Sequence, residues 1–195
     1  MTSRRVIAPR DSVTFVFNQA VDKDTVEKEI EISPSIQTTL HWSKNNYELE
    51  VRPRHFFEPG EKYKVEMSVP TGLLKNKTKE FEMSFAVENF PQVAKVEVES
   101  AEDEERIKIN SDFKMFFDKS TKGYDVTFDM RPNKNFLYEV NEERTEFRIY
   151  SNDDLEHDTQ YQMAVTVRLA LSDKKTKAPE KTVYSGNFQT EKKKV

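Results

Sequence analysis

The sequence predicts an all-β protein made of two tandem β-sandwich domains, residues 1–90 and 91–195. Three observations predict this fold: short segments of alternating apolar residues, turn residues between them, and an internal repeat with a period close to 100 residues. A chain of 195 residues is long enough for two domains of about 95 residues, each with a small core of its own.

The repeat begins with residues 13–18 (VTFVFN), which correspond to residues 113–118 (FKMFFD) at an offset of 100. Apolar residues alternate with others in both copies, as in a strand with one buried face. Three further pairs follow in the same order at an offset of 98, so the second copy is two residues shorter between the first and second pairs. These pairs are residues 30–34 with 128–132, residues 49–51 with 147–149, and residues 57–63 with 155–161.

An alternating strand follows the tyrosine that ends the last pair, Tyr63 in one copy and Tyr161 in the other. The final strand covers residues 81–85 in the first copy and ends near Phe188 in the second. Each copy therefore contains six or seven short strands, the number expected of a sandwich. Turn residues separate these strands at Asn45-Asn46, at Pro59-Gly60 and at residues 152–154.

One helical turn is expected in the first copy, where Asp24 would cap the helix and Glu27 would complete a capping box. The two-residue deletion falls in this region of the second copy. Tyr63 and Tyr161 each follow a turn and begin a long strand. That placement predicts a tyrosine corner, in which the hydroxyl group bonds back to the backbone.

The domain boundary lies at residues 89–92, where Pro91 disfavours a helical conformation for Phe90. A linker this short leaves little freedom, and we expect Phe90 to pack between the modules. The predicted pair is therefore stiff and elongated. Two sandwiches end to end would reach roughly 70–80 Å, given the rise per residue of a strand.

The first copy resembles the bacterial Ig-like domain of S-layer and other cell-surface proteins, over residues 6–88. The resemblance rests on Pro9 before the first strand, the polar turn at residues 18–22, Trp42, Pro53 and the segment 57–63. The second copy lacks the Trp and has His157-Asp158 in place of Pro-Gly, so its assignment depends on the repeat. The resemblance implies two tandem immunoglobulin-like sandwiches and an extracellular or cell-envelope location.

Composition excludes several functions. Hydrophobic residues make up 35% and charged residues 34% of the chain, and the net charge is −4. Without a basic domain or stripe, nucleic-acid binding is not expected, and the basic residues 192–194 are interpreted as a solvated tail.

The absence of cysteine excludes disulfides and thiol catalysis. No apolar run is long enough for a membrane helix. The first residues lack the apolar stretch of a signal peptide, and we expect a segment of a longer chain.

No residue is predicted to be catalytic, to bind a cofactor or to bind a metal. His41, His55 and His157 lack the spacing of metal ligands. The acidic residues 152–158 contain no glycine for a calcium loop and are interpreted as a turn, and residues 102–105 as a solvated loop. The four glycines form no phosphate loop, and no nucleophile elbow is present. The formal sequon at residues 76–78 is interpreted as a turn, and Leu73 and Leu74 as packing within the module.

The predicted function is therefore that of a non-enzymatic structural or spacer module of a bacterial cell-surface or secreted protein, monomeric when isolated. One alternative is adhesion or ligand binding, with a protein or polysaccharide of the cell envelope as partner. That role could use an exposed edge strand or exposed aromatic residues, for which Phe56, Phe136 and Tyr138 are candidates. Another alternative is an accessory arm of an envelope enzyme such as a peptidoglycan transpeptidase or peptidase. The divergent second module is the better candidate for a specialised surface.

Overall fold

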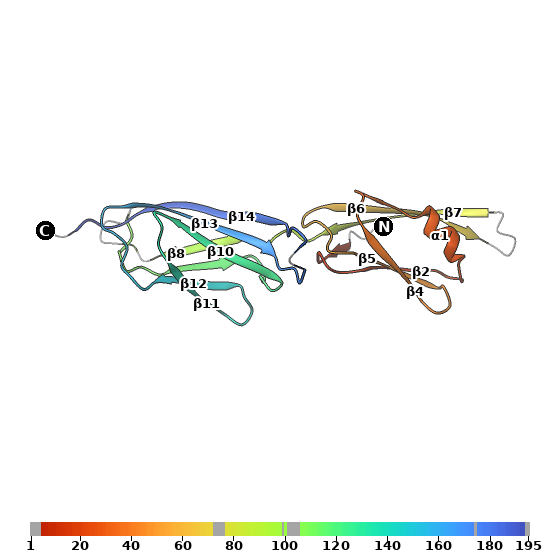
Figure 1. Cartoon of the computed structure of the whole chain (residues 1–195), viewed down its shortest axis with the longest axis horizontal. Coiled ribbons are helices and arrows are strands. Elements are labelled where there is room, and N and C mark those ends of the chain that lie inside the picture. The colour runs from red at the N-terminus through yellow and green to blue at the C-terminus, as the bar shows by residue number, and fades with distance from the viewer. Residues whose placement is uncertain (1–4, 72–76, 99, 101–105, 174, 194–195) are drawn as a thin grey trace. The chain divides into compact units, whose positions relative to one another are not determined.

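A computed structural model describes residues 5–71, 77–98, 100, 106–173 and 175–193 (Figure 1). The chain divides into two compact units, residues 1–89 and 90–195. In the described part of each unit, seven strands form two sheets that enclose a hydrophobic core. The prediction of an all-β fold built of β-sandwiches is confirmed.

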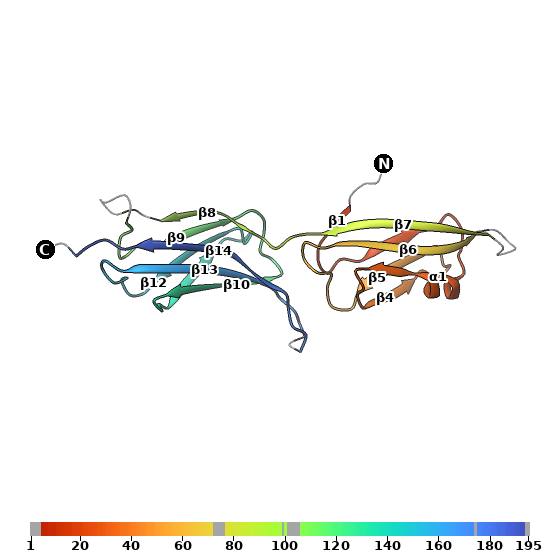
Figure 2. The same cartoon turned by 90° about the horizontal axis from the view of Figure 1, so that it is seen from above.

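The first unit contains one sheet with the strand order β1-β7-β6-β3 and a second with the order β2-β5-β4. Strand β1 is parallel to β7, and the other pairs are antiparallel, so β1, β7 and β6 lie side by side (Figure 2). The strands are β1 (Arg5–Ile7), β2 (Val13–Val16), β3 (Glu31–Ser33), β4 (Thr38–Trp42), β5 (Glu48–Pro53), β6 (Lys62–Thr71) and β7 (Lys77–Val87).

The core of this unit follows from the alternation in the sequence. Val13 and Phe15 on β2 are buried, as are Leu49 and Val51 opposite them on β5, while the intervening residues of β2 face solvent. Burying one face of each strand removes apolar area from water, which stabilises the fold by about 25 cal/mol for each Å² buried. The two sheets therefore adhere through the apolar positions that the sequence pattern identified.

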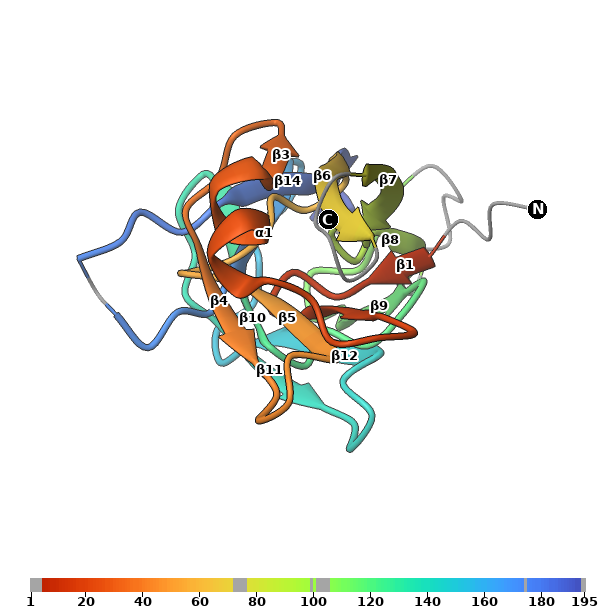
Figure 3. The same cartoon turned by 90° about the vertical axis from the view of Figure 1, so that its right-hand side faces the viewer.

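The helix α1 (Lys23–Glu29) follows β2 and leads into β3, so it carries the chain from one sheet to the other along the side of the first unit (Figure 3). The prediction that Asp24 caps this helix is wrong. Asp22 is the N-cap, because its backbone is extended and its side chain accepts a hydrogen bond from the Asp24 amide at 3.1 Å. Glu27 instead accepts a hydrogen bond from the Trp42 indole at 2.9 Å.

The second unit contains one sheet with the order β10-β13-β14 and another with the order β11-β12-β9-β8, all antiparallel. No helix is present among its described residues, because the region equivalent to α1 is a turn followed by the longer strand β10. The strands are β8 (Val93–Val98), β9 (Phe113–Phe117), β10 (Tyr124–Arg131), β11 (Phe136–Val140), β12 (Glu146–Ser151), β13 (Gln160–Leu169) and β14 (Glu180–Gln189).

The tyrosines that anchor the repeat occupy the same position in both units. The hydroxyl oxygen of Tyr63 accepts a hydrogen bond from the Glu58 amide at 3.1 Å, and that of Tyr161 accepts one from the Glu156 amide at 3.1 Å. Each ring also stacks on the phenylalanine opposite it. The Tyr63–Phe85 centroids are 5.5 Å apart and the Tyr161–Phe188 centroids 5.6 Å. The predicted bond from hydroxyl to backbone is confirmed in both copies.

The hairpin turns recur as well. The Asn46 amide donates to the Ser43 carbonyl and the Arg144 amide to the Asn141 carbonyl, both at 3.0 Å. Asn46 and Arg144 have the left-handed φ values of 56° and 55°. The Ser43 hydroxyl and the Asn141 side-chain carbonyl then each accept hydrogen bonds from the next two amides. The same hairpin is therefore built in the two units from different residues.

The segment at the domain boundary is anchored on both sides. The side chain of Asn89 lies over Gly60, in close contact with the position that a Cβ atom would occupy. Phe90 belongs to the core of the second unit, where its ring lies 5.9 Å from that of Tyr124. Gln92 donates from its amide to the Asp118 carboxylate at 2.8 Å. Neighbouring residues are thus held by different units, without a free segment between them.

Candidate functional site

The histidines do not form a site. His41 is exposed on β4, His55 is exposed after β5, and His157 lies in a turn with Nδ1 3.2 Å from the Glu191 carbonyl oxygen. Among the residues that the structure describes, no group of three or more His, Asp or Glu side chains could hold a metal ion. In the same part of the chain, no helix is both long and apolar enough to cross a membrane.

The acidic residues 152–158 form a turn in which Leu155 and Asp158 help to hold the fold. Leu155 is buried, and its amide donates to the Ile109 carbonyl at 2.8 Å. Asp158 pairs with Arg106 at 2.6 Å, and this guanidinium lowers the pKa of the Asp158 carboxyl below its ordinary value. Residues 102–105, Asn76 of the sequon and the apolar residues Leu73 and Leu74 lie outside the described residues.

The candidate binding aromatics pack against their own module. Tyr138 is 47% exposed as a residue, yet its ring centroid lies 5.5 Å from that of Phe128 and 5.6 Å from that of Phe147. Phe136 is half-buried and meets the ring of Phe113 at 6.4 Å. Phe56 is also half-buried. Within the second unit, Phe136 and Tyr138 therefore pack against neighbouring rings of their own module.

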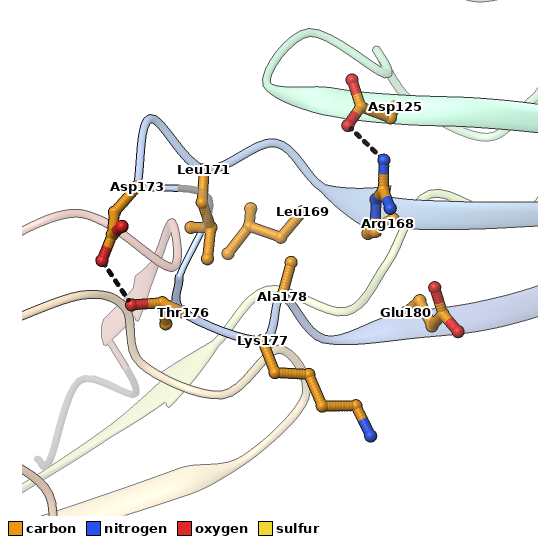
Figure 4. A pocket seen from close by; sticks show the side chains of 9 residues that line it. All are labelled: Asp125, Arg168, Leu169, Leu171, Asp173, Thr176, Lys177, Ala178 and Glu180. Atoms are coloured by element: carbon orange, nitrogen blue, oxygen red, sulfur yellow. Dashed lines mark hydrogen bonds and ion pairs between the residues drawn. The ribbon is translucent and has the colours of Figure 1, made fainter.

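A hollow of about 500 Å³ lies instead beneath the connection between β13 and β14 (Figure 4). Tyr161 lies 98 positions after Tyr63, whereas its partner Phe188 lies 103 positions after Phe85. The β13–β14 connection is therefore five residues longer than its β6–β7 counterpart. The described residues of this larger loop, 170–173 and 175–179, lie beside the ends of β13 and β14 and contribute to the lining of the hollow.

Backbone and side-chain bonds hold the described part of this loop. The Leu169 amide donates to the Pro179 carbonyl and the Ala170 amide to the Gly123 carbonyl, both at 3.0 Å. Asp173 accepts from the Lys175 amide at 2.9 Å and from the Thr176 hydroxyl at 2.8 Å. These bonds give the loop a defined turn despite its exposure.

The lining of the hollow combines charged and apolar side chains. Arg168 pairs with Asp125 at 3.2 Å on one side, as the dashed line in Figure 4 marks, and Leu169 and Leu171 form part of its wall. Lys177 of the loop and Glu180 at the start of β14 line the hollow as well. Charged side chains of both signs, which offer hydrogen-bond donors and acceptors beside an apolar wall, suit a polar ligand such as a sugar or a peptide segment. No serine, threonine or cysteine nucleophile lies beside a histidine base among the described lining residues.

Sequence reasoning missed this hollow, although a sign of it was present in the repeat. From the second pair of repeated segments up to Tyr161 the two copies keep an offset of 98, and the last strand is expected only to end near Phe188. The jump in offset between these two anchors identifies the enlarged loop. Its surface could not be predicted, because an exposed loop carries no apolar periodicity.

The strand orders, the two packed sheets and the tyrosine corners define both units as immunoglobulin-like β-sandwiches. Within this class, residues 10–71 match the family model of the bacterial Ig domain. The match confirms, for the first unit, the resemblance that its sequence predicts. The matched family is one of Ig domains and not of catalytic domains. A search of curated proteins finds no match.

Several solved structures are similar to the chain. The N-terminal part of the bacterial S-layer protein SbsC is 14% identical, with 100% of this chain and 45% of that chain covered at a TM-score of 0.33. The SGBP-B protein of a Bacteroides ovatus mixed-linkage glucan utilization locus, solved with a heptasaccharide, is 12% identical, with coverages of 98% and 44% and a TM-score of 0.32. Domains EC1–3 of mouse protocadherin PcdhgC3 are 12% identical, with coverages of 96% and 64% and a TM-score of 0.35. The chain spans less than two thirds of each of these structures.

Proposed function

We propose that the chain is a non-catalytic structural module of a bacterial cell-surface protein, in which two Ig-like sandwiches act as a spacer. The match of residues 10–71 to the bacterial Ig domain supports the class of protein. The polar side chains of the turns support the non-catalytic role, because Asp158, Asn141 and Ser43 are engaged in bonds that hold the fold.

The observation that carries the spacer role is that two consecutive residues at the boundary are each held by a different unit. Asn89 packs over Gly60 in the first unit. Phe90 is only 8% exposed and belongs to the core of the second unit. A spacer transmits position only when its joints have few free torsions, and a flexible segment would lose that property.

Small-angle scattering tests this role on the full chain. We would compare it with a variant that carries a flexible Gly-Ser insertion between Asn89 and Phe90, at matched concentration. The insertion should broaden the distribution of interatomic distances, because it adds free torsions at the joint. Indistinguishable distributions for the two proteins would contradict the proposed spacer role.

Ligand binding is the second candidate function, and the hollow beneath the β13–β14 loop favours it. The test uses soluble cell-wall polysaccharide and peptide fractions added to the chain, with amide shifts of Leu171, Thr176 and Lys177 as the readout. A variant that shortens the loop by five residues to the length in the first unit is the matched control. Shifts that persist in the shortened variant would exclude the hollow as the site.

The third role, an accessory arm of an envelope enzyme, depends on what the gene encodes beyond this chain. Reading the gene on both sides of these residues for a catalytic domain is the direct test. An adjoining transpeptidase or peptidase domain would favour the accessory role over that of a simple spacer.

A further inference from the structure

We propose that two copies of this chain associate through the free edge of β11 in the second unit, and that the two β11 strands pair antiparallel about a twofold axis at Leu137. This inference goes beyond the spacer role and does not depend on it. It departs from the expectation of a monomer, because the exposed residues of this edge are complementary to a second copy of themselves.

Strand β11 is the last strand of its sheet. It pairs with β12 in the strand order β11-β12-β9-β8, and Figure 1 shows it at the lower border of the second unit. The chain is described continuously from residue 106 to residue 173, on both sides of β11. Within that stretch, no strand pairs with β11 on the side opposite β12. This side of the strand is therefore open to a neighbour.

The backbone of β11 directs alternate hydrogen-bonding groups to the open side. The Asn141 amide, just after the strand, donates to the Glu146 carbonyl at 3.1 Å, on the β12 side. Because successive amides of a strand alternate in direction, those of Phe136 and Tyr138 face away from β12. An added antiparallel strand can therefore bond to the backbone of Phe136 and Tyr138.

The same edge exposes apolar side chains. Six large apolar residues are exposed in the described part of the chain, and two of them, Leu137 at 48% and Tyr138 at 47%, are neighbours on β11. Natural edge strands are commonly protected by Lys, Pro or a bulge. β11 has the sequence FLYEV and pairs with β12 without a register shift, so it has none of these protections. An apolar edge without them favours association.

The equivalent edge of the first unit has a different composition. Strand β4 corresponds to β11 at an offset of 98, since the two strands pair in the same register with the equivalent strands β5 and β12. β4 begins with Thr38 and Thr39, where β11 begins with Phe136 and Leu137. Exposed threonines keep their hydroxyl groups in water, whereas exposed apolar side chains gain free energy when a partner buries them. The edge of the second unit is therefore the one that benefits from a partner.

The side chains of β11 complement a second β11. With the twofold axis at Leu137, each Leu137 lies opposite its own copy, Phe136 lies opposite Tyr138, and Glu139 lies opposite Asn135. Residues with outward amides then face one another, so each pair of Phe136 with Tyr138 exchanges two backbone hydrogen bonds. Aromatic and aliphatic cross-strand pairs stabilise a sheet, and this register keeps the two Glu139 carboxylates apart.

The neighbouring registers fit less well. An axis at Tyr138 would place Leu137 opposite Glu139 of the other copy, a carboxylate that already pairs with Arg148 at 3.4 Å. An axis at Glu139 would place two carboxylates opposite each other, and like charges directly opposite destabilise a sheet. The side chains therefore select the register centred on Leu137.

The charges at the ends of β11 favour the antiparallel direction. Lys134 precedes the strand and stays charged while it donates to the Asp154 carbonyl at 3.0 Å, whereas Glu139 lies near the end of the strand and Glu142 follows it. An antiparallel pair places the basic start of one strand beside the acidic end of the other, and a parallel pair would bring like charges together. A single edge strand buries less than the ~1,200 Å² of a stable interface, so we expect association at roughly millimolar concentration.

The test uses the full chain in sedimentation velocity and NMR experiments, at concentrations from about 20 µM to about 1 mM. The sedimentation coefficient should rise toward that of a dimer. Hydrogen exchange at the Phe136 and Tyr138 amides should slow roughly twofold or more over this range, because the dimer pairs these amides. Exchange at the equivalent Thr38 and Leu40 amides should stay constant. A chain that remains monomeric at the highest concentration, or dimers without this protection, would overturn the proposal.

The variants Leu137→Lys and Leu137→Glu test the register. Leu137 is exposed, so both variants should keep the melting temperature of the natural protein. Each variant alone places like charges on the axis and should remain monomeric at about 1 mM. An equimolar mixture should restore the dimer, because opposite charges then meet on the axis. Thr39→Lys, at the equivalent exposed position of β4, is the matched control and should dimerise like the natural protein.

The register centred on Tyr138 predicts the opposite result for Leu137→Lys. In that register the new ammonium would meet the Glu139 carboxylate of the other copy, and the dimer would become stronger. Stronger association of Leu137→Lys, or a dimer that survives in both Leu137 variants, would overturn the proposal.

Discussion

At the scale of single residues, the tyrosine hydroxyls carry a testable share of the stability. Tyr63 is buried, and its hydroxyl satisfies the Glu58 amide. Tyr63→Phe leaves that amide without its partner, and we expect a loss of about 1 kcal/mol or more in the unfolding free energy of the first unit. Chemical denaturation checks the result.

Tyr47→Phe is the matched control for this prediction. Tyr47 is 44% exposed. Removing its hydroxyl group should change the unfolding free energy by less than about 0.5 kcal/mol, as surface substitutions usually do. Equal effects of the Tyr63 and Tyr47 substitutions would contradict the structural role of the corner.

The Arg106–Asp158 pair predicts a pH dependence. The guanidinium lowers the pKa of the Asp158 carboxyl, so the folded state favours the ionised form more than the unfolded state does. The resulting stabilisation is present above the ordinary carboxyl pKa of 3.8 and is lost as the pH falls through the lower folded value. Asp158→Asn should therefore be less stable than the natural protein at pH 7, with the difference shrinking at more acidic pH.

Asparagine suits this test because Asp158 has a φ of 49°, a conformation that asparagine tolerates. Unfolding free energies measured from pH 7 down to about pH 2 would give the difference curve, because the stabilisation is lost only below the ordinary pKa of the carboxyl. Asp153→Asn, in the exposed part of the same turn, is the control. A pH-independent difference for Asp158→Asn would show that the ion pair is not its cause.

At the scale of the elements, the two equivalent hairpins predict an effect of turn chemistry. Asn46 and Arg144 share a left-handed backbone, which asparagine adopts at lower cost than arginine. Arg144→Asn should stabilise the second unit by about 0.5 kcal/mol, and Asn46→Arg should destabilise the first by a similar amount. Thermal unfolding of the two variants checks both signs.

The contact of the Arg144 guanidinium with the Phe147 ring, at 5.8 Å, opposes the first effect. Arg144→Gly removes the same contact and also relieves the backbone, so it serves as a second measurement. If both Arg144 variants destabilise the protein, the ring contact outweighs the cost of the left-handed turn.

The elements also show how far the sequence could predict the structure. The alternation and the repeat identify β2, β5, β6 and their counterparts, because these strands bury one face and must alternate. The cap of α1 was misplaced, since Asp22 and Asp24 both suit the position and only the backbone angle at Asp22 decides between them. The sequence pattern could not predict which strand pairs with β8, or the hollow beside the β13–β14 connection. Tertiary pairing and loop length produce no local periodicity in the sequence.

At the scale of the whole molecule, each unit has a hydrophobic core of its own, and each should fold alone. The position of the boundary then matters, because the predicted limit after residue 90 would separate Phe90 from the core that buries it. Fragments 1–89 and 89–195 should both show cooperative unfolding and native dispersion of their NMR spectra. A fragment beginning at Pro91 should be less stable than one beginning at Asn89.

Phe90→Ala in the full chain isolates the same contribution without a new terminus. Phe90 is 8% exposed and contacts the Tyr124 ring, so its truncation should cost the second unit about 3 kcal/mol and leave the first unchanged. The two units can be followed separately through amide resonances of Val65 and Val165, which are buried on equivalent strands. A loss of stability confined to the first unit would assign Phe90 to the first core. An equal loss in both would mean that the units unfold as one, so that the joint transmits stability as well as position.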